Sequence, residues 1–434
     1  MEGIRQRNIS VLMLPWLAHG HISPFLELAK RLSYRNFEIY FCSTLVNLTS
    51  IKHEIFEKYC HSIHLVELHL PSSPELPPHY HTTKGLPPHL MPALKKAFDM
   101  ASPDFSNILK TVKPDVLIYD FLQPWVPALA FSQNIPAINF MTMGATMVSY
   151  VLHLMKKPDD EFPFQEIHLP DYNKSKFIQV DDQTYTSKVL TWLKQPFDAV
   201  LIKTVQGIEG KYIDYLSALI RKKVVPVGPL VQDVVLGNDE NPKIFEWLDD
   251  KQPSSSVFVS FGSEYFLSKE EIEEIAYGLE YSMVNFIWVV RFPMGERIKL
   301  DKVLPRGFFE RIRGRGMVVE DWAPQAKILA HSSIGGFVSH CGWSSVMESM
   351  KFGVPIIAMP MHIDQPLNAR LVEEVGVANE VKRNKDGKLE REEVAKVIKE
   401  VMVENNENDI RRKAKEMGGN IRNKRRERHR RSGR

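Results

Sequence analysis

The 434-residue sequence predicts an α/β protein with two doubly wound parallel-sheet domains. Its length exceeds what a single ordinary hydrophobic core serves, so two domains are expected. In both halves, short apolar runs alternate with segments whose apolar residues recur at helical spacing. Such alternation is typical of strand–helix–strand units in a parallel sheet. Because ligands bind at the carboxyl ends of such strands, two facing sheets would form a cleft that holds the site.

The expected elements follow one another in a regular order. In the first half, we expect strands at residues 10–16, 37–42 and 116–119, and a helix at residues 22–32. In the second half, we expect strands at residues 257–260, 286–291, 317–320, 336–339 and 355–359. Helices are expected between them at residues 269–281, 325–330, 345–352 and 365–375.

Gly, Pro and acidic residues interrupt this order at residues 228–242, which predicts an interdomain linker. The N-terminal domain is therefore expected at residues 1–227 and the C-terminal domain at residues 243–415. Residues 411–434 carry twelve Lys and Arg against two Glu, although the whole chain has a net charge of only +3. A basic tail can bind RNA or anionic lipid. Because no aromatic residues interleave these charges, we expect residues 416–434 to be a disordered tail without a nucleic-acid partner.

The cysteines and the apolar segments also indicate in which cellular compartment the protein is expected. The three cysteines, Cys42, Cys60 and Cys341, form no CxxC pair, which argues against a disulfide framework or a zinc ribbon. The apolar run at residues 11–17 is short and is followed by His19-Gly20-His21 instead of a small-residue cleavage site. No apolar stretch reaches the ~20 residues that a membrane span needs. We expect a cytoplasmic, monomeric protein without a membrane span.

The segment from Trp322 to Gln365 carries polar residues at successive strand-to-helix turns. His340 to Ser345 leads from a strand into a helix, whose exposed N–H groups and positive dipole favour a diphosphate. A capping box formed by Ser345 and Glu348 is the alternative, and it would need no ligand. Trp322 either stacks on a base or belongs to the core, as most Trp residues do.

A second group of polar residues lies in the first half. His21 falls between the first strand and the first helix, where the helix N-terminus keeps an imidazole neutral and able to accept a proton. Asp120 follows the strand at residues 116–119 and can orient the ring and stabilise the cation that forms. His19 is the competing base, but it lies further from the predicted helix. The sequence therefore predicts a His21–Asp120 dyad for general-base catalysis.

These motifs resemble those of the plant family of UDP-sugar-dependent glycosyltransferases. The segment WAPQAKILAHSSIGGFVSHCGWSSVMESMKFGVPIIAMPMHIDQ resembles the family's signature box, GHISP its catalytic-His motif and LIYD its Asp motif. The resemblance covers roughly residues 8 to 415. It implies the GT-B fold, in which two Rossmann-like domains face each other across the active site. It also implies that His21 is the base and Asp120 its partner.

The resemblance assigns the donor-binding residues in the order base, phosphate and sugar. Trp322 would stack on uracil, and the Ala323 backbone and Gln325 would line the base and ribose. His340 and Ser345 would hold the diphosphate, and Glu348 the ribose hydroxyls.

The remaining assignments concern the sugar and the phosphate-side loops. Asp364 and Gln365 would bind the sugar, and Gln at this position is the family's usual mark of glucose preference. Thr142 matches, with weaker specificity, a position that contacts the donor sugar or phosphate, and Ser263 resembles part of the phosphate-side loop that opens the second domain. The other expected donor-binding residues are Gly342, Trp343 and Ser344. Many relatives have Asn in place of Ser344, and Ser keeps a hydrogen-bonding oxygen but lacks the reach of the amide.

Three longer segments resemble one subgroup of the family. They are LPWLAHGHISPFLELAKRLS, VELHLPSSPELPPHYHTTKGLPPHLMPAL and VSFGSEYFLSKEEIEEIAYGLE. Members of this subgroup add glucose to a sugar of a triterpenoid, apocarotenoid or flavonoid glucoside, often through a β-1,6 link. The resemblance thus implies UDP-glucose as co-substrate, a small-molecule glycoside as acceptor, inversion at the anomeric carbon, and neither a metal nor a further cofactor.

Several departures keep alternatives open. Residues 150–198 form a shorter segment than in relatives, and residues 205–210 differ from the usual Phe-Arg-Glu-Leu-Glu-Gly. Relatives continue past residue 414 with an acidic and then apolar helix, whereas this chain turns to Gly418-Gly419 and basic residues. The alternatives are transfer directly to an aglycone, or a UDP-sugar-binding protein made inactive by its altered C-terminus. A nicotinamide oxidoreductase is disfavoured, because no GxGxxG motif follows the first strand.

Overall fold

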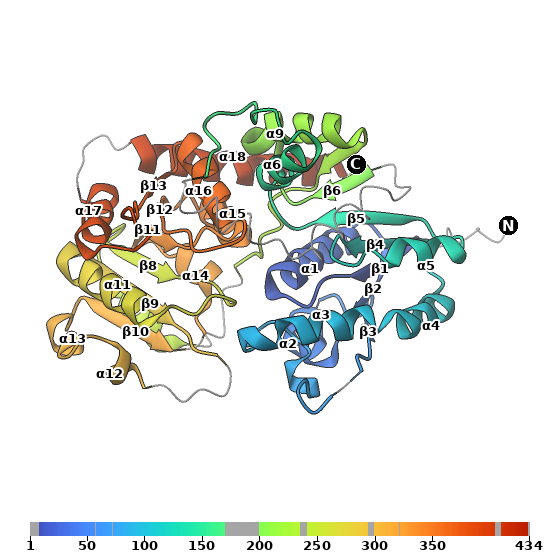
Figure 1. Ribbon diagram of the computed structural model, residues 1–434, viewed down its shortest axis with the longest axis horizontal. Coiled ribbons are helices and arrows are strands. Elements are labelled where there is room, and N and C mark those ends of the chain that lie inside the picture. Colours follow the sequence, from blue (N-terminus) through green and yellow to red (C-terminus); the bar gives the residue numbers. More distant parts are fainter. Residues whose placement is uncertain are drawn as a thin grey trace. The chain divides into compact units, whose positions relative to one another are not determined.

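The computed structural model describes residues 8–169 except 57 and 72, and residues 199–234, 241–293, 299–320, 322–403 and 409–432. The chain divides into two compact units. The first contains the described residues up to Leu152 and from Ala199 to Leu230. The second contains residues 153–169 and those from Val231 onward. Each unit is an α/β structure built on one parallel sheet (Figure 1).

The sheet of the first unit has, within the described residues, seven strands in the order β3-β2-β1-β4-β5-β6-β7. Their bounds are β1 Ser10–Leu14, β2 Glu38–Ser43, β3 Ile63–Glu67, β4 Val116–Asp120, β5 Ala137–Met141, β6 Ala199–Ile202 and β7 Lys223–Pro226. The helices of this part of the chain are α1 His19–Ser33, α2 Leu45–Phe56, α3 Met91–Asp99, α4 Ser102–Val112, α5 Val126–Ser132, α6 Ala145–Lys156 and α9 Gln206–Ile220. Short 3₁₀ turns lie at Pro78–Tyr80 and Pro88–Leu90.

The sheet of the second unit has six strands in the described part of the chain, in the order β10-β9-β8-β11-β12-β13. They are β8 Ser256–Ser260, β9 Asn285–Val290, β10 Gly316–Glu320, β11 Ile334–Ser339, β12 Ile356–Ala358 and β13 Ala378–Glu380. The first helices are α10 Pro242–Asp249, α11 Lys269–Ser282, α12 Leu300–Val303, α13 Phe308–Arg311 and α14 Gln325–Leu329. The last are α15 Trp343–Phe352, α16 Gln365–Glu374, α17 Arg391–Met402 and α18 Asp409–Ser432.

In each sheet the chain adds strands first on one side of a central strand and then on the other side. Strand β1 pairs in parallel with β2 on one side and with β4 on the other. Strand β8 likewise pairs with β9 and with β11. At such a switch point the loops after the two central strands turn to opposite faces of the sheet and leave room for a ligand. The predicted α/β class with two doubly wound sheets is therefore confirmed.

The central strands are buried because they are apolar on both faces, as parallel strands covered by helices must be. All five residues of β1 and all five of β8 are buried. Phe25 of α1 packs against Phe140 of β5, with 4.8 Å between the ring centroids. In the second unit, Trp288 of β9 is wholly buried and contacts Phe308 edge to face. These cores fix the strand ends that carry the polar residues.

Two expectations about the bounds of elements and units differ from the structure. Helix α1 begins at His19, so His21 lies inside its first turn instead of before it. The division between the units falls at Leu230, inside the predicted linker, but residues 153–169 group with the second unit and not with the first as expected. Of the linker, residues 235–240 lie outside the described residues, as do residues 170–198 of the shortened segment and residues 433–434.

The prediction of a disordered tail is wrong for the backbone of residues 416–432, which continues helix α18. The physical reason is packing near the start of this segment. Ala414 is buried, and Gly418, four residues later on the same helix face, lies against Gly353, the C-cap residue of α15. Composition alone does not reveal these small residues as a contact surface.

Candidate active site

His21, Asp120 and Thr142 come together at the switch point of the first sheet. The His21 Nδ1 atom lies 2.5 Å from Asp120 Oδ2 and 3.0 Å from Thr142 Oγ1. Asp120 ends β4, Thr142 follows β5, and His21 lies in the first turn of the helix that follows β1. Because β1, β4 and β5 are neighbours in the sheet, their carboxyl ends bring the three side chains together.

The contact with Asp120 fixes which ring nitrogen of His21 carries the proton. The Asp120 side chain is fully buried, whereas that of His21 keeps 19% of its surface exposed. The second carboxylate oxygen of Asp120 accepts a hydrogen bond of 3.2 Å from the backbone N–H of Leu122. A carboxylate accepts hydrogen bonds only, so Nδ1 of His21 must carry the proton that it shares with Asp120. In this tautomer the lone pair of the neutral ring lies on Nε2.

Glu209, which was not predicted as a site residue, supports this group through the start of α6. Its buried carboxylate accepts hydrogen bonds from the backbone N–H groups of Ala145 and Thr146, at 2.9 and 2.7 Å, and from the Thr146 hydroxyl. It therefore binds the first N–H groups of α6, directly after the turn that carries Thr142. The only sequence signal is an acidic residue in the first turn of the helix after β6.

His340 lies at the switch point of the second sheet, directly after β11. A Cβ atom added to Gly262 or to Gly342 would fall 2.6 or 2.5 Å from His340 Nε2, so the imidazole is enclosed between two glycines. Gly262 has a φ of +79°, which glycine adopts without strain. Burial, together with His362 and Arg291 nearby, lowers the pKa of His340 to about 3. The ring is therefore neutral at physiological pH.

Helix α15 begins next to His340. Its N-cap is Gly342, without a side-chain cap, and Ser345 is the third residue of the helix. The alternative that Ser345 and Glu348 form a capping box is therefore wrong, because the helix starts three residues earlier. Instead, Gln325 Nε2 donates to Ser345 Oγ at 3.0 Å and to Glu348 Oε2 at 2.8 Å. Three of the predicted donor-binding side chains thus form one cluster at a helix N-terminus.

Trp322 follows strand β10 and is half-buried. The guanidinium carbon of Arg291, directly after β9, lies 4.9 Å from the centroid of the Trp322 ring. This cation–π contact places a positive charge beside the Trp322 ring, which is predicted to stack on a base. Arg291 was not predicted as a site residue, although the sequence places it at a strand end.

The remaining predicted donor-binding residues lie at the same edge of the second sheet. Ala323 is buried and follows Trp322, and Ser263 follows Gly262 in the loop after β8. Trp343 and Ser344 are the first two residues of α15, and the Trp343 side chain is buried. A buried ring leaves the backbone of Trp343, and not its indole, as the part suited to contact a ligand at the helix N-terminus.

Asp364 and Gln365 lie in the connection from β12 to α16. Asp364 is the N-cap residue of α16, and Gln365 is its first residue. Asn368 Nδ2 donates to Asp364 Oδ2 at 2.8 Å and to the carbonyl oxygen of Cys341 at 2.9 Å. Asn368 therefore links the predicted sugar-binding loop to the loop that carries His340.

The described part of the chain contains neither a metal-holding cluster nor a membrane-spanning helix. Among these residues, no group of three or more His, Cys, Asp or Glu is arranged to hold a metal ion. None of the helices described here is both long enough and apolar enough to cross a membrane.

Comparison with known proteins identifies the family. Residues 235–413 match the model described as UDP-glucoronosyl and UDP-glucosyl transferase, and residues 7–232 match that of the glycosyltransferase N-terminal domain. Mogroside IIIx synthase of Siraitia grosvenorii is 58% identical, with 98% of this chain and 92% of that protein covered. Beta-D-glucosyl crocetin beta-1,6-glucosyltransferase of Gardenia jasminoides is 53% identical, with 94% of each covered.

A solved structure agrees with this assignment. Medicago truncatula UGT71G1 complexed with UDP-glucose is 28% identical and superposes with a TM-score of 0.77, over 96% of this chain and 94% of that one. The chain therefore has the GT-B fold and belongs to the plant family of UDP-sugar-dependent glycosyltransferases, enzymes whose co-substrate is a UDP-sugar.

Proposed function

We propose that this enzyme is an inverting glucosyltransferase that moves glucose from UDP-glucose to a sugar hydroxyl of a small-molecule glucoside. The observation that carries the chemistry is the 2.5 Å contact between His21 Nδ1 and the buried Asp120 carboxylate. This contact directs the lone pair of the imidazole to Nε2, where a neutral His acts as a general base.

The reaction is a single displacement. His21 Nε2 takes the proton of the acceptor hydroxyl as its oxygen attacks the anomeric carbon of glucose. The new C–O bond forms as the bond between that carbon and the β-phosphate oxygen breaks, and UDP leaves with the electron pair. The α-linked donor gives a β-glucoside. Asp120 stabilises the imidazolium that forms, and such a base contributes about 10²–10⁴-fold to the rate.

The second unit supplies the donor contacts in this proposal. The N-terminus of α15 faces the diphosphate with its N–H groups and dipole. His340, held neutral between Gly262 and Gly342, donates one hydrogen bond to the charge that develops on the departing phosphate. The Gln325–Ser345–Glu348 cluster binds the ribose and phosphate side, and Trp322 stacks on the uracil. Asp364 and Gln365 bind the glucose.

The acceptor class is supported by the relatives. One relative is named a mogroside IIIx synthase, and another is named for β-1,6 glucosylation of glucosyl crocetin. Their identity of 58% and 53% extends over nearly the whole chain. We therefore propose a terpenoid, apocarotenoid or flavonoid glycoside as the acceptor, and a β-1,6 link as the product.

We also propose that the enzyme is a cytoplasmic monomer. Cys42 and Cys341 are buried and Cys60 is exposed, and none of the three forms a disulfide. Free thiols of this kind suit a reducing compartment. Size-exclusion chromatography with light scattering tests the monomer, and a fluorescent fusion in plant cells tests the location.

The test of the proposed reaction is release of UDP from UDP-glucose across a panel of glycosides and their aglycones. Wild type is compared with His21→Ala and with the matched variant His61→Ala, which changes an exposed His of the same unit. We expect release only with glycosides, and a loss of at least ~10²-fold in His21→Ala alone. Release with aglycones would contradict the acceptor class. Binding of UDP-glucose without any transfer would instead favour an inactive UDP-sugar-binding protein.

A further inference from the structure

The loop at residues 360–364, between β12 and α16, contains a residue with a strained backbone conformation. Ile363 has a φ of +55°, in the left-handed region that β-branched residues rarely adopt. Its side chain is 51% exposed, so burial of Ile363 itself does not hold this conformation. A strained residue of this kind persists only where the surrounding structure fixes it. The contacts of the loop therefore decide where Asp364 and Gln365 point.

Gln365 closes the loop with its own side chain. Its Oε1 atom accepts hydrogen bonds from the backbone N–H groups of Met361 and His362, both at 3.0 Å. An amide oxygen has two lone pairs, and both are used here. The part of the Gln365 amide that is left for a sugar is the NH₂ group, which only donates. The orientation of this donor depends on the backbone at Met361 and His362.

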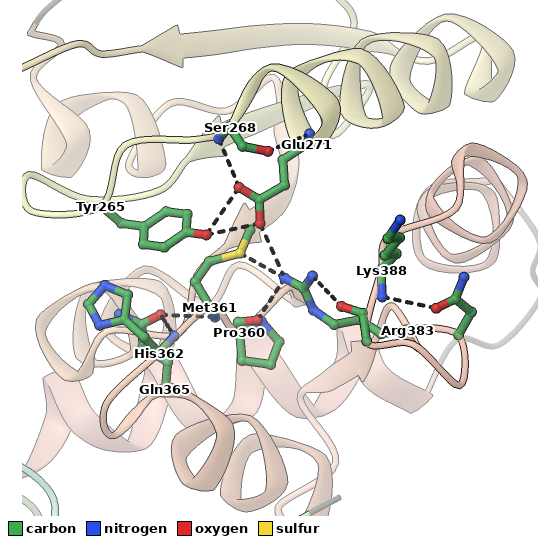
Figure 2. A network of polar contacts seen from close by, with 11 residues as sticks. Tyr265, Ser268, Glu271, Pro360, Met361, His362, Gln365, Arg383 and Lys388 are labelled. Carbon is green, nitrogen blue, oxygen red and sulfur yellow. Dashed lines mark hydrogen bonds and ion pairs between the residues drawn. The ribbon is translucent and has the colours of Figure 1, made fainter. Parts of the chain in front are cut away.

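Arg383, just after β13, holds the same backbone from the other side. One terminal nitrogen donates to the carbonyl oxygen of Pro360 at 3.2 Å and also contacts the Met361 sulfur. The other donates to the carbonyl oxygen of Gly387 at 3.1 Å. Figure 2 shows the guanidinium between the Pro360–Met361 backbone and the carboxylate of Glu271. A terminal nitrogen of Arg383 lies 4.0 Å from Glu271 Oε1. The Arg383 side chain is only 12% exposed, so solvent screens this arrangement weakly.

Glu271 connects this arrangement to α11 and to a tyrosine. Its backbone N–H and carboxylate form a capping box with Ser268, so the helix start fixes its position. The hydroxyl of Tyr265 donates to the two carboxylate oxygens of Glu271 at 2.9 and 3.0 Å. The centroid of the Tyr265 ring lies 5.0 Å from that of the His362 imidazole. Figure 2 shows the two rings side by side. Tyr265 and Arg383 thus contact the loop on both sides of Met361, and Glu271 holds both of them.

We propose that Arg383 is a positioning residue for the donor sugar: with Glu271 and Tyr265 it fixes the loop that aims the Gln365 NH₂ group at the sugar hydroxyls. The inference rests on the proposed function, because it takes Asp364 and Gln365 to be the sugar site. The two parts of the donor, UDP and glucose, would then be bound by different groups of residues. The contacts of the uridine and the diphosphate come from α14, α15 and the residues that follow β10 and β11, and the sugar contacts depend on Arg383.

The test compares the affinity for UDP-glucose with that for UDP, measured by calorimetry on the whole chain. Arg383→Met removes the guanidinium but keeps the apolar stem. We expect it to weaken UDP-glucose binding about tenfold and UDP binding less than about twofold. The matched control is Arg391→Met, which removes an ion pair with Glu274 on the same helix α11 but no contact with the loop. This control is expected to leave both affinities unchanged. Arg383→Lys restores one donor and is expected to recover part of the loss.

Two further variants keep the inference testable if Arg383→Met does not fold. Glu271→Gln retains the capping box, because Gln serves at this position as Glu does, but removes the charge that faces Arg383. Tyr265→Phe removes only the hydroxyl. Both are expected to weaken UDP-glucose binding selectively, by a smaller factor than Arg383→Met. Equal losses for UDP and UDP-glucose, or no loss in any variant, would overturn the inference and leave the proposed function intact. If wild type binds no UDP-glucose, the proposed function fails and this inference fails with it.

Discussion

Gly418 of helix α18 lies directly against the backbone of Gly353, the C-cap residue that follows helix α15. A Cβ atom added to Gly418 would fall 2.9 Å from Gly353 N and 3.0 Å from its Cα. Gly353 has a φ of +74° as the C-cap of α15, so neither backbone can easily move away. Arg422 of α18 also donates to the carbonyl oxygen of Lys351, one residue before the end of α15. The C-terminal helix therefore supports the helix whose N-terminus is the proposed diphosphate site.

The pair Gly418 and Gly419 tests this contact with the same substitution at two neighbouring positions. Gly418→Ala places a methyl group against backbone and is expected to destabilise the second unit by about 1–3 kcal/mol. Gly419 has open space at its Cβ position, so Gly419→Ala is expected to stabilise α18 by about 0.5–1 kcal/mol through helix propensity. Urea denaturation of the two variants beside wild type measures both effects. Equal changes in the two variants would show that α18 makes no close contact at Gly418.

Asp120 provides a test of the dyad that separates orientation from charge. Asp120→Asn keeps the size of the side chain, but its amide can donate to Nδ1 and favour the wrong tautomer of His21. We expect kcat to fall by about 10²–10⁴-fold while the KM for UDP-glucose stays within about twofold. Thr142→Val removes the second contact of Nδ1, at 3.0 Å, and is expected to cost less than Asp120→Asn. A larger loss in Thr142→Val would mean that Thr142, and not Asp120, orients the ring.

The sequence was sufficient for residues whose position follows from the end of an apolar strand. Asp120 and His340 are predicted at strand ends and lie there, because the turn after a buried parallel strand is set by the strand itself. His21 is predicted between the first strand and the first helix, and it lies in the first turn of that helix. The contacts between side chains far apart in the sequence were not predictable in this way. Arg291 lies over Trp322, and Arg383 holds Pro360, because their strands are neighbours in the sheet, and no local pattern records that pairing.

Two local patterns were also misleading, for physical reasons. The spacing of Ser345 and Glu348 fits a capping box, but Gly342 can start the helix without a side-chain cap, and the two residues then lie inside it. The basic residues after Lys415 are typical of a disordered tail. Helix α18 forms nevertheless, because Ala414 and Gly418 share one face and pack against α15. In α18 a tertiary contact outweighs the local preference.

Glu209 is predicted to be a structural residue that stabilises the start of α6, directly after the turn that carries Thr142. Glu209→Gln replaces one of two accepting oxygens with an NH₂ group, which would face the N–H group of either Ala145 or Thr146. A buried donor opposed to a donor costs about 1–3 kcal/mol of folding stability. The measurement is the urea midpoint of Glu209→Gln beside that of Asp214→Asn, an exposed acid-to-amide change on the same helix α9. An equal midpoint in both variants would contradict the capping role.

His340 is expected to make the second unit sensitive to acid. The pKa of His340 is about 3 in the folded chain, mainly because of burial, against an ordinary value of about 6.5 in the unfolded chain. Between these two values the unfolded chain binds a proton that the folded chain does not. The stability that neutral His340 contributes is therefore fully present above pH 6.5 and is lost as the pH falls towards 3. The loss approaches about 1.4 kcal/mol per pH unit well below pH 6.5.

His340→Gln removes this proton and should flatten the dependence. We expect wild type to lose about 1.5 kcal/mol more than His340→Gln between pH 6.5 and pH 5, measured by urea denaturation at each pH. His61→Gln changes an exposed His and should keep the wild-type slope. Burial also lowers the pKa of His362, so His340→Gln retains part of the acid sensitivity, and the double variant with His362→Gln should remove more of it. A wild-type slope in His340→Gln would mean that its imidazole takes up a proton without unfolding, and the neutral donor assigned to the diphosphate would then be wrong.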